Sequence, residues 1–432
     1  MVPNFLQMKI LTTTLILLLG FLPFSLVAQD FWEQLPFPDT ARIWCFDVNS
    51  QNEIFIGTGG DNTHGCIYKS SDNGQSWSVF YDFNGELIAR IGITDSDKIF
   101  VSKGGIEQLV YSDDNGESWN IIEPPPYAYL GVNEMLCVGN DTVYMGYWEE
   151  DGALLVRTVD NGQTYDSLFR TVNHTSEYIG DILVSNNEIY LGLGAYFPDR
   201  GGVYKSVDFG HSWEFLGLLN HSVSSLVLNN NNDLIAGVRG AEGNNSSGIY
   251  KLPQDENEWN TLISGPMVED LLINEIGDIY FSSSWPQGIG ISTNNGDSFE
   301  WIAEGLQDIS IEELLLDGEG YIYANTPGLS NILFRSINPT VGTDPFNIDE
   351  NFTKEINVYP NPAKDFISIN FQESLEKYMV NIFAIDGKTL LKSISGEGNA
   401  IINIPLNDLS NGVYIIHLKS DNYSKSYKFI KH

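Results

Sequence analysis

The sequence is built around a short turn motif that returns at regular intervals. Its form is S/T-x-D/N-x-G-x-S/T-aromatic, and copies occupy residues 70–77, 112–119, 158–165, 206–213 and 292–299. In a tight hairpin, the Asp or Asn oxygen and the Ser or Thr hydroxyl accept backbone N–H groups that the turn leaves unpaired, and Gly supplies a positive φ. The aromatic residue then opens the next strand and packs inward. We therefore interpret these residues as structural turns.

The positions that form the predicted turns are Ser70, Asp72, Gly74, Trp77, Ser112, Asp114, Gly116, Trp119, Thr158, Asp160, Gly162, Tyr165, Ser206, Asp208, Gly210, Trp213, Ser292, Asn294, Gly296 and Phe299.

The turns belong to a longer repeat. Apolar runs that precede them begin at residues 52, 97, 141, 187, 232, 277 and 320, which is a period of about 45 residues over seven copies. The fifth copy has lost its turn motif to residues 253–256 but keeps Trp259 in register. Four short β runs in a repeat of this length are typical of a propeller blade, which is buried by stacking on its neighbours. The sequence predicts an all-β, seven-bladed β-propeller.

The ring is predicted to close through the N-terminus. The seventh repeat ends near residue 336 without a turn motif or an outer strand, whereas residues 31–35 form a strand-like run before the first repeat. We expect this run to complete blade seven, because closure removes open sheet edges.

The net charge is unevenly distributed between two parts of the chain. The formal charge is −35, yet residues 354–432 hold nine Lys and eight acidic residues, which leaves 13 of the 22 basic and 49 of the 57 acidic residues before them. This excess of acidic residues before residue 354 argues against nucleic acid or anionic lipid as a partner. The change in composition predicts a separate C-terminal unit.

These patterns give four segments: residues 1–29 as a signal peptide, 30–337 as the propeller, 338–355 as a linker and 356–432 as a small C-terminal β-sandwich. The apolar N-terminal run is interrupted by Gly20 and Pro23, which favours a cleaved signal over a membrane anchor. Cys45, Cys66 and Cys137 are too scattered for a disulfide framework. A bond between Cys45 and Cys66 and two buried thiols both remain open.

The C-terminal segment resembles the type A C-terminal sorting domain of the type IX (Por) secretion system of Bacteroidetes. The resemblance spans the segment and rests on a Y-P-N-P start, an L-S-x-G-x-Y strand and a K-F-I-K end. The matching positions are Tyr359, Pro360, Asn361, Pro362, Gly412, Tyr414, Lys428, Phe429 and Lys431. It implies Sec export to the periplasm and passage across the outer membrane by the secretion machinery. A secreted or surface-attached protein, without membrane-spanning segments, is expected.

The turn motif resembles the Asp-box, or BNR, repeat of sialidases, sortilin-type receptors, xyloglucanases and photosystem II assembly factors. In those families the turns lie away from the active face. Ligands are therefore expected on the opposite face, where the loops between second and third strands meet around the channel. Aromatic and charged loop residues there suit sugars, which stack on rings and hydrogen-bond to charged groups. The candidate ligand-binding residues are Trp148, Glu150, Asp151, Tyr196, Asp199, Arg200, Arg239 and Trp285.

Catalysis is less well supported by the sequence. A sialidase-like site needs three converging Arg, for which Arg42, Arg90, Arg200 and Arg239 are available, but the R-I-P motif is absent because Trp44 follows Arg42-Ile43. A xyloglucanase-like cleft needs two propellers. Paired acids such as Glu150 and Asp199 would suit a glycoside hydrolase, although no spacing selects them.

The preferred hypothesis is therefore a monomeric, non-catalytic protein that binds an extracellular glycan or protein. A glycoside hydrolase of exo-sialidase-like or related type is the alternative. Catalytic residues are not assigned, and no cofactor or metal site is predicted.

Overall fold

The structure is a computed structural model. It describes residues 31–432 except 61–64, 105–108, 126–130, 150–151, 174–176, 197–199, 241–245, 303–304, 307–308, 327–331, 341–356, 361, 371–377, 385–389, 397–400, 408, 411 and 421–422. The predicted signal peptide lies outside the described residues, as does most of the predicted linker.

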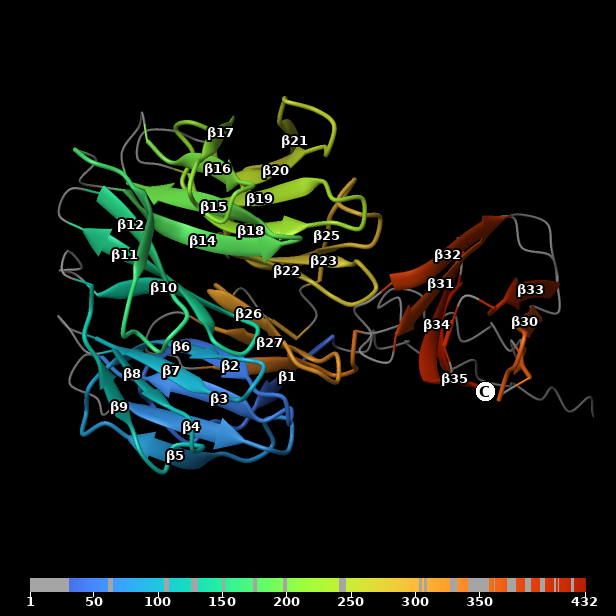
Figure 1. The fold of residues 1–432 in the computed structure, drawn as a ribbon, viewed down its shortest axis with the longest axis horizontal. Coiled ribbons are helices and arrows are strands. Elements are labelled where there is room, and N and C mark those ends of the chain that lie inside the picture. The colour runs from blue at the N-terminus through green and yellow to red at the C-terminus, as the bar shows by residue number, and fades with distance from the viewer. Residues whose placement is uncertain are drawn as a thin grey trace, which may run out of the picture.

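Seven four-stranded antiparallel sheets form the propeller, from blue to orange in Figure 1. Blade 1 is β2 (Ile43–Val48), β3 (Ile54–Thr58), β4 (Cys66–Ser70) and β5 (Ser78–Asp82). Blade 2 is β6 (Ile88–Ile93), β7 (Ile99–Lys103), β8 (Leu109–Ser112) and β9 (Asn120–Ile122). Blade 3 is β10 (Val132–Val138), β11 (Thr142–Glu149), β12 (Gly152–Thr158) and β13 (Asp166–Arg170). Blade 4 is β14 (Glu177–Ser185), β15 (Glu188–Ala195), β16 (Gly202–Ser206) and β17 (Glu214–Gly217).

The remaining blades follow the same order from inner to outer strand. Blade 5 is β18 (Val223–Leu228), β19 (Leu234–Val238), β20 (Gly248–Leu252) and β21 (Asn260–Ser264). Blade 6 is β22 (Met267–Ile273), β23 (Ile279–Trp285), β24 (Gln287–Ser292) and β25 (Glu300–Trp301). Blade 7 is β26 (Glu313–Leu316), β27 (Ile322–Asn325), β28 (Leu333–Ser336) and, as its outer strand, β1 (Trp32–Leu35). The inner strands contact each other in sequence, and β26 contacts β2, so the ring is closed.

The N-terminal strand closes the ring as predicted. β1 pairs with β28 in the register Trp32 to Ser336 and Leu35 to Leu333. Trp32 is almost fully buried, and its indole N–H donates to the Ile302 carbonyl of blade 6 at 3.1 Å. Contacts of the propeller reach Thr340, whose backbone N–H donates to the Gly320 carbonyl at 2.6 Å.

The repeated turns have the predicted hydrogen bonds. In the first copy, Asp72 accepts the Ser70 hydroxyl at 2.8 Å, the Ser76 backbone N–H at 2.8 Å and the Ser76 hydroxyl at 2.5 Å. Ser70 in turn accepts the Gly74 N–H at 2.9 Å. Asn294 replaces the acid in blade 6 and still accepts the Ser298 N–H at 3.0 Å. The amide therefore substitutes for the carboxylate without loss of the turn.

The turn aromatics also join neighbouring blades. Trp213 donates its indole N–H to the Leu168 carbonyl of blade 3 at 2.8 Å, and Trp259 donates to Leu216 of blade 4 at 2.9 Å. Trp259 belongs to blade 5, which lacks the turn motif. The aromatic contact between blades is thus independent of the turn chemistry.

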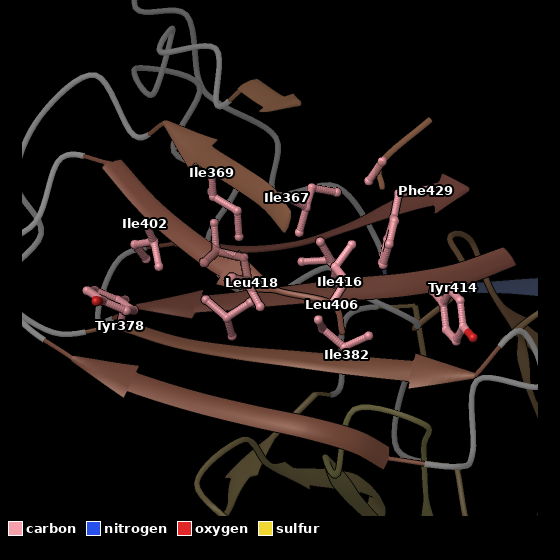
Figure 2. Close-up of a cluster of buried hydrophobic side chains, with 13 residues drawn as sticks. Ile367, Ile369, Tyr378, Ile382, Ile402, Leu406, Tyr414, Ile416, Leu418 and Phe429 are labelled. Carbon is pink, nitrogen blue, oxygen red and sulfur yellow. The ribbon is translucent and has the colours of Figure 1, made fainter. Parts of the chain in front are cut away.

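The C-terminal module is a β-sandwich. One sheet contains β29 (Asn357–Tyr359), β30 (Phe366–Asn370) and β33 (Ile401–Pro405). The other contains β32 (Leu390–Gly396), β31 (Tyr378–Ala384), β34 (Gly412–Ser420) and β35 (Tyr423–Lys431). Apolar side chains of both sheets, including Ile369, Ile416 and Leu418, meet in one buried cluster (Figure 2).

Candidate functional site

The four-stranded meander places the connections of each blade at two opposite ends. The repeated turns and the turns after the inner strands lie at one end, which we call the turn side. Connections from second to third strand and from blade to blade lie at the other, the loop side. Of the predicted ligand-binding residues that the structure describes, Trp148, Tyr196, Arg200, Arg239 and Trp285 lie on the loop side or at a strand end that reaches it.

Three aromatic rings from blades 3 and 4 meet at the loop side. Trp148 lies at the end of β11, Tyr178 at the start of β14 and Tyr196 directly after β15. The Trp148 and Tyr196 ring centroids are 5.7 Å apart, and Tyr178 lies 6.3 Å from Trp148 and 5.6 Å from Tyr196. Trp148 is 36% exposed and Tyr196 52% exposed. These three rings form a continuous surface, the aromatic platform.

Gly194 in β15 allows the platform to form. A Cβ atom on Gly194 would lie 2.1 Å from Cζ and 2.6 Å from the hydroxyl oxygen of Tyr178. Tyr178 and Gly194 are cross-strand partners in the sheet of blade 4. Any side chain at residue 194 would therefore force the Tyr178 ring to move.

Two ion pairs also lie on the loop side. Arg239, directly after β19, pairs with Glu269 of β22, and Glu269 also accepts the Ser284 hydroxyl at 2.5 Å. Arg42, just before β2, donates to both carboxylate oxygens of Glu312 at 2.7 and 2.9 Å. Each guanidinium therefore has its own carboxylate.

Electrostatic interactions connect these pairs to the platform. Burial would lower the pKa of Arg239, but Glu269, Tyr178 and Glu312 together raise it above its ordinary value. Burial raises the pKa of the Tyr196 hydroxyl, and nearby Arg239 opposes that shift. Arg239 is therefore electrostatically coupled to both platform tyrosines and to Glu312.

Farther along the inner strands, equivalent positions of the seven blades hold a set of residues that are mostly polar. In six blades this residue follows a β-bulge, which re-aims the side chain. The seven residues are Cys45, Arg90, Glu134, Asp181, Ser225, Asp270 and Glu313. Four carboxylates and a single guanidinium therefore stand in this ring, which we call the carboxylate ring.

Members of the carboxylate ring act on each other across the channel. Burial raises the pKa values of Glu134, Asp181, Asp270 and Glu313. Asp270 of blade 6 adds to the shift of Glu134 in blade 3, while Arg90 opposes it from a distance of 3.6 Å. The side chains of Arg90 and Glu134 keep 30% and 23% of their surface exposed, so the channel interior is open at this level.

The structure brings together only some of the predicted site residues. Trp148 and Tyr196 are in ring contact, and Arg239 interacts electrostatically with Tyr196. Arg200 reaches the Asn173 carbonyl at 3.5 Å instead. Trp285, 68% exposed at the end of β23, pairs with exposed Met267 of β22. Glu150, Asp151 and Asp199 lie outside the described residues.

Sequence reasoning missed Tyr178, Glu269, Glu312 and the carboxylate ring. The ring had a signal in the sequence, because a polar residue recurs about every 45 residues within the predominantly apolar inner strands, as in Glu134, Asp181 and Asp270. The candidate residues were sought in the loops between strands, whereas the carboxylate ring lies in the inner strands. Alignment of the seven inner strands would have revealed the ring.

The possible bond between Cys45 and Cys66 is absent. Both residues, and Cys137, are free thiols. Within the described residues, no three His, Cys, Asp or Glu side chains are grouped so that they could hold a metal ion. In the same part of the chain, no helix has the length and apolarity needed to cross a membrane.

In the C-terminal module, two of the predicted sorting residues are core residues. The Tyr414 and Phe429 rings stack at 5.4 Å, and the Tyr414 hydroxyl donates to the Ser410 carbonyl at 2.6 Å. Tyr359 is 43% exposed. Asn361 and the Lys428 side chain lie outside the described part.

This module decides the destination of the chain. Residues 357–432 match a family described as the secretion system C-terminal sorting domain. The chain carries a C-terminal sorting domain. The match confirms the predicted resemblance and supports export to the cell surface or the medium. No curated protein sequence matches the chain.

Solved structures share the propeller fold. PorZ of Porphyromonas gingivalis, described as an essential surface component of the type IX secretion system, is 13% identical with a TM-score of 0.55, and the match covers 92% of this chain and 61% of PorZ. YCF48 bound to D1 peptide is 15% identical with a TM-score of 0.56, covering 72% and 97%. Virginiamycin B lyase from Staphylococcus aureus is 11% identical with a TM-score of 0.55, covering 70% and 98%.

At these identities the likeness concerns the fold alone. The chain spans about 61% of the length of PorZ. One of these propellers is described with a bound peptide and another as a lyase. Binding and catalysis must therefore be argued from the channel mouth itself.

Proposed function

We propose that this exported propeller is a monomeric, non-catalytic binding protein whose loop-side channel mouth takes an extracellular glycan or protein. The observation that carries the proposal is the aromatic platform. Large aromatic surfaces that stay exposed beside a channel provide apolar contact area for a ligand. Trp148 and Tyr196 are exposed there, although most large apolar side chains of the propeller are buried.

The arginines support binding over a sialidase-like reaction. A sialidase-like site requires three guanidinium groups that converge on one carboxylate of the substrate. Here Arg42 pairs with Glu312, Arg90 with Glu134 and Arg239 with Glu269. These guanidinium groups are neutralised by the protein itself, so little positive charge is available for an acidic sugar.

A glycoside hydrolase remains the second candidate, because the carboxylate ring has raised pKa values. A raised pKa suits a carboxylic acid to the role of general acid. Glu313 is the residue that would supply it, since burial raises its pKa, whereas Glu134 is paired with Arg90. Such a reaction would release sugar, whereas binding alone would not.

The test is to incubate the full chain with immobilised neutral polysaccharides, sialosides and a pooled peptide library, and to score retained protein and released sugar together. We expect retention without release, and a loss of retention in Trp148→Ala/Tyr196→Ala. The matched control is Val207→Ser, which changes a residue that is 67% exposed on the turn side. Released sugar that disappears in Glu313→Gln would instead establish a hydrolase.

A further inference from the structure

The charge of the channel limits the kind of ligand that fits the mouth. In the carboxylate ring, Glu134, Asp181, Asp270 and Glu313 are accompanied by a single guanidinium, that of Arg90, which lies 3.6 Å from Glu134. The ion pairs of Arg239 and Arg42 above them are internally balanced. A cation that enters the channel therefore meets more carboxyl groups than guanidinium groups, and its charge favours the ionised form of those acids.

Resting on the proposed function, we propose that the ligand is a protein segment that inserts a lysine or arginine side chain into the channel and lays its neighbouring residues on the aromatic platform.

Two physical features favour such a segment. A long cationic side chain carries its charge on an apolar stem, so the stem can pass the rings while the charge reaches the acids. The exposed Trp148 and Tyr196 rings attract a cation at the entrance through their π faces. A neutral sugar gains nothing from the net charge of the ring, and an acidic sugar is repelled by it.

The anchoring of the ring shows which acids can respond to a guest. Asp181 accepts the N–H groups of Ile182 and Leu226, and Asp270 accepts those of Leu271 and Leu314, so both are held by backbone. Glu134 has a longer side chain and faces Arg90 at 3.6 Å. Glu134 and Glu313 are therefore the residues through which the channel would meet the incoming cation.

Binding of a cation would be coupled to proton release. Burial raises the pKa values of Glu134 and Glu313 above their ordinary values, and a bound cation would lower them. The charged groups around them are Arg90, Asp181, Asp270 and Glu312, with the Cys45 thiol alongside. Since the guest prefers the deprotonated ring, affinity is expected to fall as the pH falls.

The test uses acetylated, amidated heptapeptides with a central Lys, Arg, norleucine or Glu, and measures their fluorescence anisotropy with the full chain. We expect the Lys and Arg peptides to bind at least tenfold more tightly than the norleucine peptide. Glu134→Gln/Glu313→Gln should abolish this preference, and Trp148→Ala/Tyr196→Ala should weaken every peptide. Melting curves establish that the variants are folded.

The matched control is Asp113→Asn/Glu117→Gln, which removes two exposed acids on the turn side and changes the net charge equally. The proposal is overturned if the preference for Lys and Arg peptides survives in Glu134→Gln/Glu313→Gln (the ring variant) but falls in this control. Such a result would show that the preference reflects general surface charge. Independently, the wild-type preference for Lys must shrink between neutral and acidic pH; a constant preference also overturns it.

Failure of this inference can be told apart from failure of the proposed function. If a glycan or the norleucine peptide is retained at the mouth and the ring variant binds it equally well, the mouth binds ligands but is not selective for cations. If no panel member is retained by the full chain, the proposed function fails as well.

Discussion

The Asp270 carboxylate of blade 6 accepts the backbone N–H of Leu314 in blade 7 at 2.9 Å. The same link joins Asp181 to Leu226 at 2.6 Å, and Asp47 to Ile93 at 2.7 Å. Each carboxylate thus connects two inner strands that have no ladder hydrogen bonds between them. Asp181 and Asp270 of the carboxylate ring therefore also stabilise the closed propeller.

The link at Asp270 can be tested by substitution. Asp270→Ala removes the acceptor of the Leu314 and Leu271 N–H groups and of the Ser225 hydroxyl. Because buried donors without acceptors cost about 1–3 kcal/mol each, we expect the free energy of unfolding to fall by about 2 kcal/mol or more. Urea unfolding measures this, with exposed Asp113→Ala as the control. Equal stability of both variants would show that the link contributes nothing.

Asp47 predicts a specific pH dependence. Burial raises the pKa of Asp47 to about 7. The hydrogen bonds that it accepts from the N–H groups of Val48 and Ile93 lower the pKa, but by less than burial raises it. The folded state therefore holds this proton more tightly than the unfolded state, whose pKa is near 3.9. Stability contributed by the protonated group is complete below about pH 4 and is lost as the pH rises through 7.

The Asp47→Asn variant checks that sign. It cannot lose a proton, so its free energy of unfolding relative to wild type should rise between pH 4 and pH 8. Denaturant unfolding at several pH values measures the difference. A difference that stays constant with pH, or falls, would contradict a raised pKa at Asp47.

Phe209 occupies a strained position in the blade 4 turn. Its φ is 60°, whereas the equivalent residues of the other turn copies are Asn73, Asn115, Asn161 and Asn295 with φ between 56° and 63°. Asn tolerates this conformation better than a bulky residue. We expect Phe209→Asn to raise the free energy of unfolding by about 1 kcal/mol.

The reverse substitution is the control for that prediction. Asn115→Phe places a bulky residue at the same turn position of blade 2 and should destabilise by a similar amount in thermal unfolding. If both variants change stability in the same direction, the conformation of this position is not the cause.

The three thiols are expected to be unreactive in the folded protein. Burial raises the pKa values of Cys45 and Cys137 far above the ordinary range, and that of Cys66 to about 11. Since the thiolate is the reactive form, a colorimetric thiol reagent should label them slowly in the native state. In denaturant without reductant it should label three thiols per chain, and a value near one would reveal a bond.

Sequence periodicity was sufficient to predict the architecture. The 45-residue period and the missing outer strand of the last repeat predicted seven blades and closure by β1, because both follow from local patterns of strand and turn. The site depended on contacts that no local pattern contains. Trp148 and Tyr196 were recognised as loop aromatics, but Tyr178 joins them only because blades 3 and 4 stack, and because Gly194 leaves room for its ring.

The residue before each turn glycine also has a positive φ. The sequence motif predicted a positive φ for the glycine alone, so this feature was missed. Arg42 and Arg239 appeared to be available for a ligand, whereas Glu312 and Glu269, which neutralise them, come from strand starts of other blades. Charge pairing between blades is a property of the closed ring and is invisible along the chain.

The most direct test of the account is hydrogen exchange of the full chain, with and without a peptide or glycan that the binding panel retains. If the ligand occupies the loop-side mouth, exchange should slow at the ends of β11, β14 and β15 that carry Trp148, Tyr178 and Tyr196. The repeated turns at residues 70–77 and 206–213 should exchange as before. Protection confined to those turns or to the C-terminal module would contradict a binding site at the channel mouth.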